Sequence, residues 1–397
     1  MKKLLALILA VLMTVSLFAG CTGGEPDTSY AITAKVNGET VTFPVEPYLY
    51  YLQWMRDYYY AYMQTVAAQS QKKLNWEEVL KSTALTAPDT LSQFLVKTAQ
   101  DQYMAYLYVE ETFKELGLTL SAEDEKAIDQ IIQQDWVSLY GHDTFNTIRQ
   151  NLGMTYDEFR NLMASNIKSE KIVEYYYGEG GVEEIAEEEM LDYYRNNYVR
   201  FKYVIFMTKD SDGNKYGSDK IKEIEGKRDA ALAELAAGTS FEDVLVKYSE
   251  DYTDITDKDL TASEKEALEL QNKTMLEEGL IIDDKGVFSE TLATYYNITV
   301  DEDIVEEVFS MKDGEYQAVT IDDSIWIVKR YSVDEEESYF EGVKEQVFKA
   351  LYSEDLSAKH TAWRQKLDYT YNQAVLDKYT PETLTDMFDF SGTGAAQ

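Results

Sequence analysis

The sequence predicts an α+β protein in which an all-helical domain, built from both ends of the chain, is interrupted by a smaller domain of strands and helices. Three observations predict this architecture. Helical periodicity dominates from Val45 to about residue 198, strand-like alternation begins at Val199, and a helical pattern returns after Val333. Helical segments on both sides of an α+β segment indicate one discontinuous helical domain.

A β-hairpin is predicted at the start of the folded part. Residues 31–36 and 40–43 are strand-like runs, and Asn37-Gly38 lies between them. Asn-Gly favours the tight turn that matches the twist of paired strands, so the two runs are expected to pair.

Two breaks inside the helical region share one pattern. Gly117 and Gly153 each follow a helical stretch, and each precedes an apolar residue and then a capping-box-like sequence, at 121–124 and 155–158. A glycine ends a helix readily, and a Ser or Thr three residues before an acid begins one. The helix before Gly117 is predicted to pack through its apolar face.

The segment 199–333 is predicted to fold as β–α–α–(insert)–α–β–β. Asp212-Gly213 marks a turn, Ser240 begins a second helix, and the polar stretch 251–286 forms the insert, with 261–280 helical in part. The remaining elements are a strand at 199–207, a helix at 220–237, an apolar run at 305–311, and strands at 317–320 and 325–331.

Beyond Val333 one helix face carries Phe340, Val343, Val347 and Leu351. After a possible kink, apolar residues at helical spacing extend this face; they are Leu356, Trp363, Leu367 and Tyr371. The domain boundaries that follow are a signal peptide at 1–20, a tether at 21–30, a helical domain at 31–198 plus 334–385, an α+β domain at 199–333, and a disordered tail at 386–397.

The first residues predict export and lipid anchoring. Lys2 and Lys3 precede the apolar run 4–15, and LFAGC follows at positions 17–21. This layout is typical of a secretory signal that is too short to span a membrane, and small residues before Cys21 are similar to a bacterial lipobox. Cys21 is the only cysteine, so it has no disulfide partner. We expect an extracytoplasmic protein attached to a membrane through a lipid on Cys21; the alternative is an ordinary signal peptide with an incidental cysteine.

Composition excludes several classes of function. The formal net charge of −36 argues against nucleic acid as a partner, since nucleic-acid binding depends on Lys and Arg. It also argues against electrostatic adhesion to anionic lipid. No Ser/His/Asp order, phosphate loop or dinucleotide fingerprint appears, and no metal or other cofactor is expected. The oligomeric state stays open.

Six segments stand out in order along the chain: AKVNGETVT, KELGLTLSAEDE, GMTYDEFRNLM leading to EEEMLDYYRNN, AELAAGTSFEDVLVKYSED, FSMKDGE and WIVKR. Together they resemble PrsA/SurA-type extracytoplasmic foldases, and the resemblance covers about residues 31–376. It implies a SurA-like helical chaperone domain, formed by both chain ends, around a parvulin-type peptidyl-prolyl isomerase domain at 199–333.

The resemblance implies a centre of two histidines, one in the first strand and one in the last, flanking a Cys or Asp. Position by position, the first histidine falls on Tyr203, the central acid on Asp251 and the last histidine on Trp326. Both family histidines are therefore replaced, and the Gly-Gly-x-Leu-Gly segment after the acid is absent. The apolar positions that would line a proline pocket are Val300, Ile304 and Phe309.

These replacements leave two interpretations. In one, Tyr203 and Asp251 keep a hydrogen-bonding pair, Trp326 supplies a donor, and a weakened isomerase remains. In the other, which we favour, the domain keeps its fold for binding or spacing and has lost catalysis, because Tyr and Trp are ordinary residues of strand cores. The predicted partners are unfolded or partly folded secreted proteins. A solute-binding lipoprotein is the alternative from a different class.

Other patterns predict structure more than chemistry. Residues 210–214 look like the start of a calcium loop, but the glycine and the terminal Glu of that loop are absent, so a plain turn is expected. The acidic run 249–259 is expected to be a solvated loop. His142 and His360 are far apart in sequence and have no partner at metal-ligand spacing.

Two tyrosine clusters, at 58–62 and 175–177, do not fit a single buried helix face. Successive side chains on a helix point about 100° apart, so some of these rings must face outward or line a groove. Client binding through exposed rings is one hypothesis, and packing of two faces of a discontinuous domain is the other.

Overall fold

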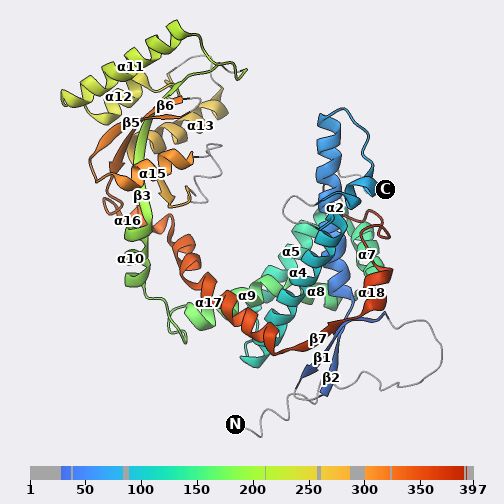
Figure 1. Cartoon of the computed structure of the whole chain (residues 1–397). Helices are drawn as coiled ribbons and strands as arrows, with labels where there is room; N and C mark the ends of the chain where they lie inside the picture. Colours follow the sequence, from blue (N-terminus) through green and yellow to red (C-terminus); the bar gives the residue numbers. More distant parts are fainter. Residues whose placement is uncertain are drawn as a thin grey trace, which may run out of the picture. The chain divides into compact units, whose positions relative to one another are not determined.

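The computed structural model describes residues 28–36, 39–83, 89–210, 212–256, 261–286, 300–321, 324–388 and 390. These residues form helices and small antiparallel sheets, which confirms the mixed α+β character predicted from the sequence (Figure 1). The chain divides into two compact units. Unit 1 is Met1–Ile172 with Lys359–Gln397, and unit 2 is Val173–Ala358. The unit boundaries fall within two helices, α9 (Ser165–Tyr177) and α17 (Lys344–Lys366).

Unit 1 contains a three-stranded antiparallel sheet in the order β2-β1-β7. The pairing of β1 with β2 confirms the predicted hairpin strands, while Asn37 and Gly38 lie outside the described residues. Ala34 of β1 is opposite Val41 of β2 and opposite Tyr369 of β7. The strands are β1 (Tyr30–Val36), β2 (Glu39–Pro44) and β7 (Asp368–Tyr371).

The helices of unit 1 pack around α2 and α4. Tyr48 of α2 and Tyr103 of α4 are fully buried with ring centroids 6.4 Å apart, and the Tyr103 hydroxyl donates to the carbonyl oxygen of Pro44 at 2.5 Å. This contact ties the helices to the end of the hairpin. The helices are α2 (Glu46–Gln69), α3 (Trp76–Lys81), α4 (Leu91–Glu115), α5 (Ala122–Ile131), the π-helical turn η2 (Ile132–Val137), α6 (Ser138–Tyr140), α7 (His142–Asn151), α8 (Tyr156–Met163), most of α9, and α18 (Gln373–Lys378).

Both predicted capping boxes are confirmed. At the start of α5, the Ser121 hydroxyl accepts from the Asp124 amide at 3.1 Å, and the Asp124 carboxylate accepts from the Ser121 amide at 2.8 Å. Thr155 and Glu158 make the same reciprocal pair at the start of α8. Each pair satisfies donors that a helix end would otherwise leave without partners, so local sequence alone sets where these helices begin.

Unit 2 contains a four-stranded antiparallel sheet in the order β4-β3-β6-β5. The central strand β3 is buried on both faces, and its Tyr203 and Ile205 are opposite Val328 and Trp326 of β6. The strands are β3 (Tyr198–Met207), β4 (Leu280–Asp283), β5 (Tyr316–Ile321) and β6 (Ser324–Tyr331).

Helices cover both faces of this sheet. Alternate residues of β3 point to opposite faces, so Val204 and Phe206 pack with α11 and α12, whereas Phe201 and Tyr203 pack with α15. The helices are α10 (Glu187–Asn197), α11 (Ser218–Ala236), α12 (Phe241–Tyr248), α13 (Ala262–Lys273), the π-helical turn η3 (Thr274–Glu278), α15 (Glu302–Ser310), α16 (Glu337–Glu341) and the larger part of α17.

Three sequence-based expectations are corrected. Leu280–Asp283, placed in the polar insert, is the edge strand β4 and pairs with the start of β3. Tyr371 does not extend the C-terminal helix, since α17 ends at Lys366 and Asp368–Tyr371 pairs with β1 as β7. Residues 386–388 and 390, expected in a disordered tail, pack against α2, and Phe388 is 5% exposed.

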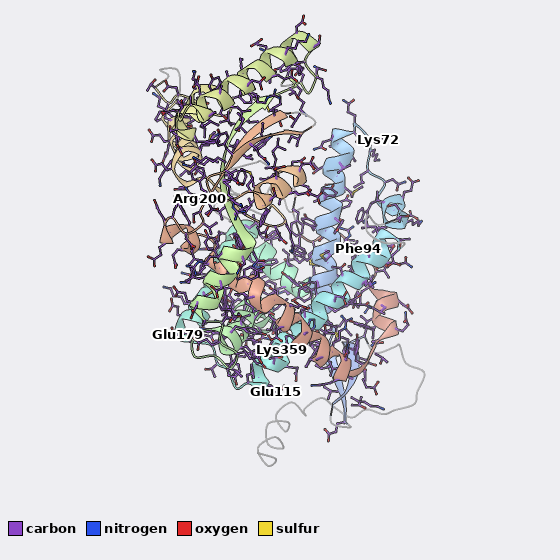
Figure 2. All side chains as sticks on the ribbon, turned by 60° about the vertical axis from the view of Figure 1, so that its left-hand side comes forward. Lys72, Phe94, Glu115, Glu179, Arg200 and Lys359 are labelled. Atoms are coloured by element: carbon purple, nitrogen blue, oxygen red, sulfur yellow. The ribbon has the colours of Figure 1, made fainter. Side chains whose placement is uncertain are left out.

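β3 also carries a buried cation. Arg200, labelled in Figure 2, is 1% exposed. Its guanidinium pairs with Glu335, donates to the carbonyl oxygens of Glu278 and Ser332, and lies 4.3 Å from the ring centroid of Tyr339. One side chain therefore joins β3 to the end of η3 and to the segment that follows β6.

Arg200→Ala is expected to lower the free energy of unfolding of unit 2 by about 3 kcal/mol, because it removes a buried ion-pair partner together with the packing of the side-chain stem. Urea denaturation of the mature chain measures the loss, and amide hydrogen exchange of residues 198–207 locates it. Arg195→Ala is the control, since Arg195 pairs with Asp334 at 3.0 Å in a half-exposed position and should change stability by less than about 1 kcal/mol. Equal losses of unfolding free energy in the two variants would contradict the stabilising role assigned to Arg200.

Candidate functional site

The first and last positions of the predicted centre lie side by side in unit 2. Tyr203 on β3 and Trp326 on β6 point to the same face of the sheet, as diagonal neighbours across the two strands. Their ring centroids are 4.7 Å apart at an interplanar angle of 38°. Tyr203 is 2% exposed and Trp326 is 4% exposed, so both rings belong to the core of the sheet.

Asp251 is held close by a segment that follows α12 along β3. The Ile205 amide donates to the Ser249 hydroxyl at 3.2 Å, and the Glu250 amide donates to the Ile205 carbonyl oxygen at 3.1 Å. With the segment fixed in this way, the Tyr203 hydroxyl donates to Oδ2 of Asp251 at 3.0 Å. The structure thus brings together all three positions that the sequence analysis singled out.

The carboxyl of this pair lies in a protein environment that disfavours its charge. Burial raises the pKa of Asp251, the hydrogen bond from Tyr203 lowers it, and the nearby charge of Glu250 raises it. The net effect is a pKa above the ordinary value of an aspartate. The phenolic hydrogen of Tyr203 is directed at this carboxylate and is therefore not presented to a bound peptide.

Trp326 does not join this hydrogen-bonded pair. Its indole Nε1 donates to the hydroxyl of Ser324, two residues earlier on β6, at 2.8 Å. A buried indole N–H requires an acceptor, and Ser324, which is 4% exposed, meets that requirement within the strand. The contact between Trp326 and Tyr203 is therefore one of packing.

The apolar positions expected to line a proline pocket lie in the same core cluster. Val300 and Ile304 are buried with Tyr203 and Trp326, and Phe309 packs at the margin of the cluster, half-buried. Ile304 and Phe309 come from α15, which covers this face of the sheet. All five side chains form one continuous apolar packing.

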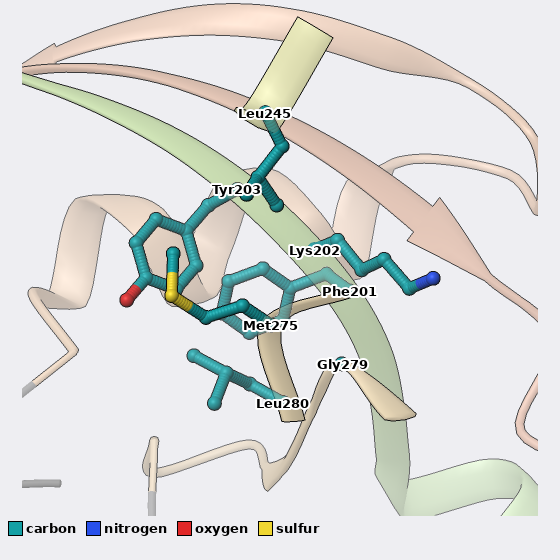
Figure 3. Close-up of a pocket in the computed structure, with 7 residues that line it drawn as sticks. All are labelled: Phe201, Lys202, Tyr203, Leu245, Met275, Gly279 and Leu280. Atoms are coloured by element: carbon teal, nitrogen blue, oxygen red, sulfur yellow. The ribbon is translucent and has the colours of Figure 1, made fainter. Parts of the chain in front are cut away.

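Among the described residues, the space beside Tyr203 is small. The opening next to its ring has no room for a water molecule, and Figure 3 shows Met275, Tyr203 and Phe201 among the side chains that line it. Gly279 allows the chain to approach β3, because its φ is +76° and an added Cβ would lie 2.8 Å from the carbonyl oxygen of Phe201. The residues that line the opening are Phe201, Lys202, Tyr203, Leu245, Met275, Gly279 and Leu280.

The other candidate positions, Asp210, His142 and His360, lie in a turn, at the surface and in an aromatic contact. The Asp210 carboxylate accepts from the amides of Asp212 and Asn214 at 3.0 and 2.8 Å, as a turn does. His142 is exposed, and His360 packs against Tyr108 with ring centroids 4.9 Å apart. Within the described residues, no group of three or more His, Cys, Asp or Glu side chains could hold a metal ion.

The signal peptide 1–20 and the lipidation position Cys21 lie outside the described residues. In the part of the chain that the structure describes, no helix is both long and apolar enough to span a bilayer. Attachment through Cys21 therefore stays a prediction from the sequence.

The first tyrosine cluster divides between core and surface. Tyr59 packs edge-on against Phe94, and Tyr60 packs against Trp76, whereas Tyr58 and Tyr62 are 46% and 51% exposed. In the second cluster, Tyr177 is buried and its hydroxyl donates to Asp355 of α17 at 2.6 Å; Tyr175 is exposed. The predicted outward-facing rings are therefore present in both clusters.

Sequence reasoning missed Asp57, which is buried on α2 and accepts the backbone amides of Met387 and Phe388. Nothing in the local sequence marks this aspartate, because the backbone amides that it accepts lie about 330 positions away. The nearest signal is the pair Phe388 and Phe390, two aromatic residues in a stretch that otherwise reads as a tail.

No protein-family model matches the chain, and no curated protein matches it. Among solved structures, the foldase protein PrsA from Streptococcus pneumoniae str. Canada MDR_19A is 16% identical with a TM-score of 0.30, over 70% of this chain and 89% of the other. PrsA from Bacillus subtilis is 16% identical with a TM-score of 0.22, over 72% of this chain and 83% of the other. Neither is close enough to place the chain in a family.

Asp251→Asn is expected to stabilise unit 2 at neutral pH. A raised pKa in the folded state means that Asp251 contributes stability below its unfolded pKa of about 4, and that this contribution is lost as the pH rises through the folded value. At pH 7 the ionised carboxylate is destabilising, so the variant should raise Tm by a few degrees at pH 7 and by nothing at pH 3.

Asp210→Asn is the matched control, because turn hydrogen bonds lower the pKa of exposed Asp210 and give the opposite sign. Its variant should not raise Tm at pH 7. A Tm for Asp251→Asn that is unchanged or lower at pH 7 would rule out the assigned environment of Asp251.

Proposed function

We propose that this chain is an extracytoplasmic foldase of the PrsA/SurA type, held at a membrane by a lipid on Cys21, which assists the folding of secreted proteins. In this proposal it acts as a chaperone that holds unfolded segments, and its parvulin-like segment at 199–333 has lost isomerase activity. The ordered resemblance of six segments and the leader before Cys21 support the class.

A surface feature of α2 carries the chaperone part of the proposal. Trp54, Tyr58 and Tyr62 follow one another at intervals of four residues, so they share one face of the helix. Trp54 and Tyr58 stack with their rings nearly parallel and centroids 5.6 Å apart, and Tyr58 and Tyr62 are about half exposed. Exposed apolar surface of this kind is typical of interaction sites.

Aromatic rings suit a chaperone because they contribute large apolar contact area with few rotatable bonds. They select for apolar content rather than for one sequence, which an unfolded client requires. The net charge of −36 complements this surface, since self-repulsion keeps chaperone–client complexes soluble.

The packing around Tyr203 supports the loss of isomerase activity. Rotation about a peptide bond has a barrier of about 18–20 kcal/mol, and a thousandfold acceleration requires only about 4 kcal/mol of stabilisation. Modest groups would suffice, but the proline ring still needs a pocket. Among the described residues, the opening beside Tyr203 has no room for a water molecule, and the donors of Tyr203 and Trp326 are directed at Asp251 and Ser324.

One observation favours a second candidate, an active isomerase with an altered centre. The Tyr203 hydroxyl and Asp251 form a hydrogen-bonded pair at 3.0 Å, at the positions that match the parvulin centre. A protonatable carboxyl beside a phenol is able to exchange hydrogen bonds with a twisted imide. The two candidates differ in one measurable quantity, the rate of isomerisation of an X–Pro bond.

A protease-coupled assay on an Ala-Pro peptide, run beside an aggregation assay with a reduced, unfolding client, separates the candidates. The mature chain is expected to leave the uncatalysed isomerisation time of roughly 10–100 s unchanged and to suppress aggregation at near-equal molar ratio. Turnover above background that disappears in Tyr203→Phe or Asp251→Ala would establish the active isomerase instead.

A double variant of α2 tests the client-aggregation assay separately. Tyr58→Ser combined with Tyr62→Ser removes two exposed rings, and at about 1 kcal/mol per ring the affinity for the client should fall about thirtyfold. Tyr175→Ser is the control, because Tyr175 is also exposed but lies in unit 2. Full protection by the double variant would remove the support that α2 gives to the proposal.

Cys21→Ala, with a signal that is still cleaved, should release the protein from the membrane fraction. Tethering raises the local concentration of a weak binder near its clients, so the folding of secreted clients in cells should fall even though aggregation suppression in solution is unchanged. Fractionation followed by immunoblotting measures the release, and the yield of an active secreted enzyme measures folding. Unchanged yield would show that the tether has no role in folding.

A further inference from the structure

The described C-terminal residues cross α2 without a helix or strand of their own. After α18, residues 380–388 and 390 run past the middle of α2, and they are held there by contacts of two kinds. One kind is polar and directed at the backbone of the segment. The other is aromatic and directed at its side chains. We refer to residues 385–388 and 390 as the C-terminal strap.

The polar contacts centre on Asp57, which is 2% exposed. Oδ2 of Asp57 accepts the successive backbone amides of Met387 and Phe388 at 2.9 and 2.8 Å. Gln53 donates to the same oxygen at 2.7 Å and to the carbonyl oxygen of Thr385 at 2.8 Å. These bonds recognise the main chain of an extended segment, so almost any residue could supply them.

The aromatic contacts lie along the face of α2 that carries Trp54, Tyr58 and Tyr62, which we call the aromatic face of α2. Phe388 lies between Tyr50 and Trp136, with ring centroids 5.9 and 5.6 Å away. Phe390 packs edge-on against Trp54 at 5.5 Å. It meets the next residue of the face, Tyr58, at 5.8 Å.

A buried cation fixes the position of the strap along the helix. Arg56, which is 5% exposed, pairs with Oδ1 of Asp57 at 2.6 Å and with the half-exposed carboxylate of Asp386. Its guanidinium also lies 5.0 Å from the ring centroid of Tyr60. Arg56 therefore holds the carboxylate of Asp57 in place and attracts an acidic residue just before the two amides.

The aromatic face is longer than the part of the strap that covers it. Tyr62, one helical turn beyond Tyr58, is 51% exposed. Phe390, at the far end of the described strap, is only half-buried, whereas Phe388 is 5% exposed. The face thus offers one occupied anchor position at Phe388 and further aromatic surface beyond it.

We propose that Asp57 and the aromatic face of α2 form a binding site for extended segments of non-native polypeptide, which the C-terminal strap occupies when no client is bound. The occupant is a peptide in extended conformation that presents two successive backbone amides to Asp57, an aromatic side chain to Tyr50 and Trp136, and preferably an acid to Arg56. This inference rests on the proposed chaperone function and names its client site.

The strap gives the site a threshold. An intramolecular segment has an effective concentration that reaches the millimolar range, so a client must displace the strap. The apparent affinity of the site for a client is therefore its intrinsic affinity multiplied by the fraction of chains whose site is open. A short apolar stretch of a nearly folded protein would compete poorly. A long unfolded segment, which also covers Tyr62, would compete well.

A fluorescent peptide with the sequence of residues 381–390 tests the proposal by anisotropy. It should bind at micromolar concentration to a mature chain that is shortened to end at Thr380, and at least tenfold more weakly to the full mature chain. Asp57→Asn in the shortened chain should weaken binding at least tenfold. Asp101→Asn, which removes an exposed carboxylate paired with Arg364, is the control and should change nothing.

A peptide with Phe388→Ala should lose most of its binding to the shortened chain. Equal binding of the original peptide to the shortened and full chains, or no binding to a shortened chain whose circular dichroism is native, would overturn the proposal.

Amide hydrogen exchange on the unshortened chain decides the matter if truncation disturbs folding. The amides of Met387 and Phe388 should exchange much faster than those of the buried part of α4. Excess free peptide should accelerate the exchange of these two strap amides and leave that of the α4 amides unchanged. Strap amides that exchange only with the core, with or without peptide, would show that the strap is a permanent part of the fold.

The outcome is separable from that of the proposed function. Peptide binding without suppression of client aggregation would leave the site in place and remove the chaperone role. Equal suppression by the full and shortened chains, with no peptide binding, would retain the chaperone role and remove this site.

Discussion

The antiparallel pairing of β1 with β7 is the constraint on which the helical unit depends. It places Ile32 opposite Tyr371, and the Asn372 side chain donates to the Tyr30 carbonyl oxygen across 342 positions of sequence. The whole of unit 2 lies within the loop that this pairing closes. Loop-closure entropy grows slowly, by about 0.6 kcal/mol for each doubling of length. A large insertion is therefore compatible with a stable helical unit, provided that both chain ends meet at β1.

The same closure delivers the C-terminal residues to α2. An isolated buried pair such as Arg56 and Asp57 is costly, because the loss of hydration commonly exceeds the mutual attraction of the charges. Burial indeed raises the pKa of Asp57, against the hydrogen bonds from Phe388, Gln53, Arg56 and Met387. The two backbone amides of Met387 and Phe388 that Asp57 accepts offset part of the cost of burying its charge. These bonds form only when the C-terminal residues reach α2, so the same contacts complete the fold and hold an extended segment.

Sequence reasoning succeeded where the determinants are local and failed where they are not. The capping boxes at Ser121 and Thr155, and the strands at 199–207 and 325–331, depend on spacing within a few residues. β7 was missed because Leu367 and Tyr371 also fit helical spacing, and only pairing with β1 makes that segment a strand. The proximity of Tyr203, Asp251 and Trp326 came from the resemblance, not from periodicity. The strap was missed because its partners on α2 cannot be read from its own composition.

The two units use aromatic side chains in opposite ways, and this contrast bears on the proposed function. At positions where the resemblance implies histidines, Tyr203 and Trp326 fill a core, and burial of such rings stabilises the sheet. In the proposed function, a centre that is filled in this way would gain stability and would lose the pocket that catalysis needs. On α2, Tyr58 and Tyr62 stay about half exposed, although Phe390 of the C-terminal strap packs against Tyr58. Rings that stay partly exposed beside the Asp57 carboxylate are better suited to transient binding than to packing, so we expect the capacity to hold a client in unit 1 rather than around Tyr203 and Trp326.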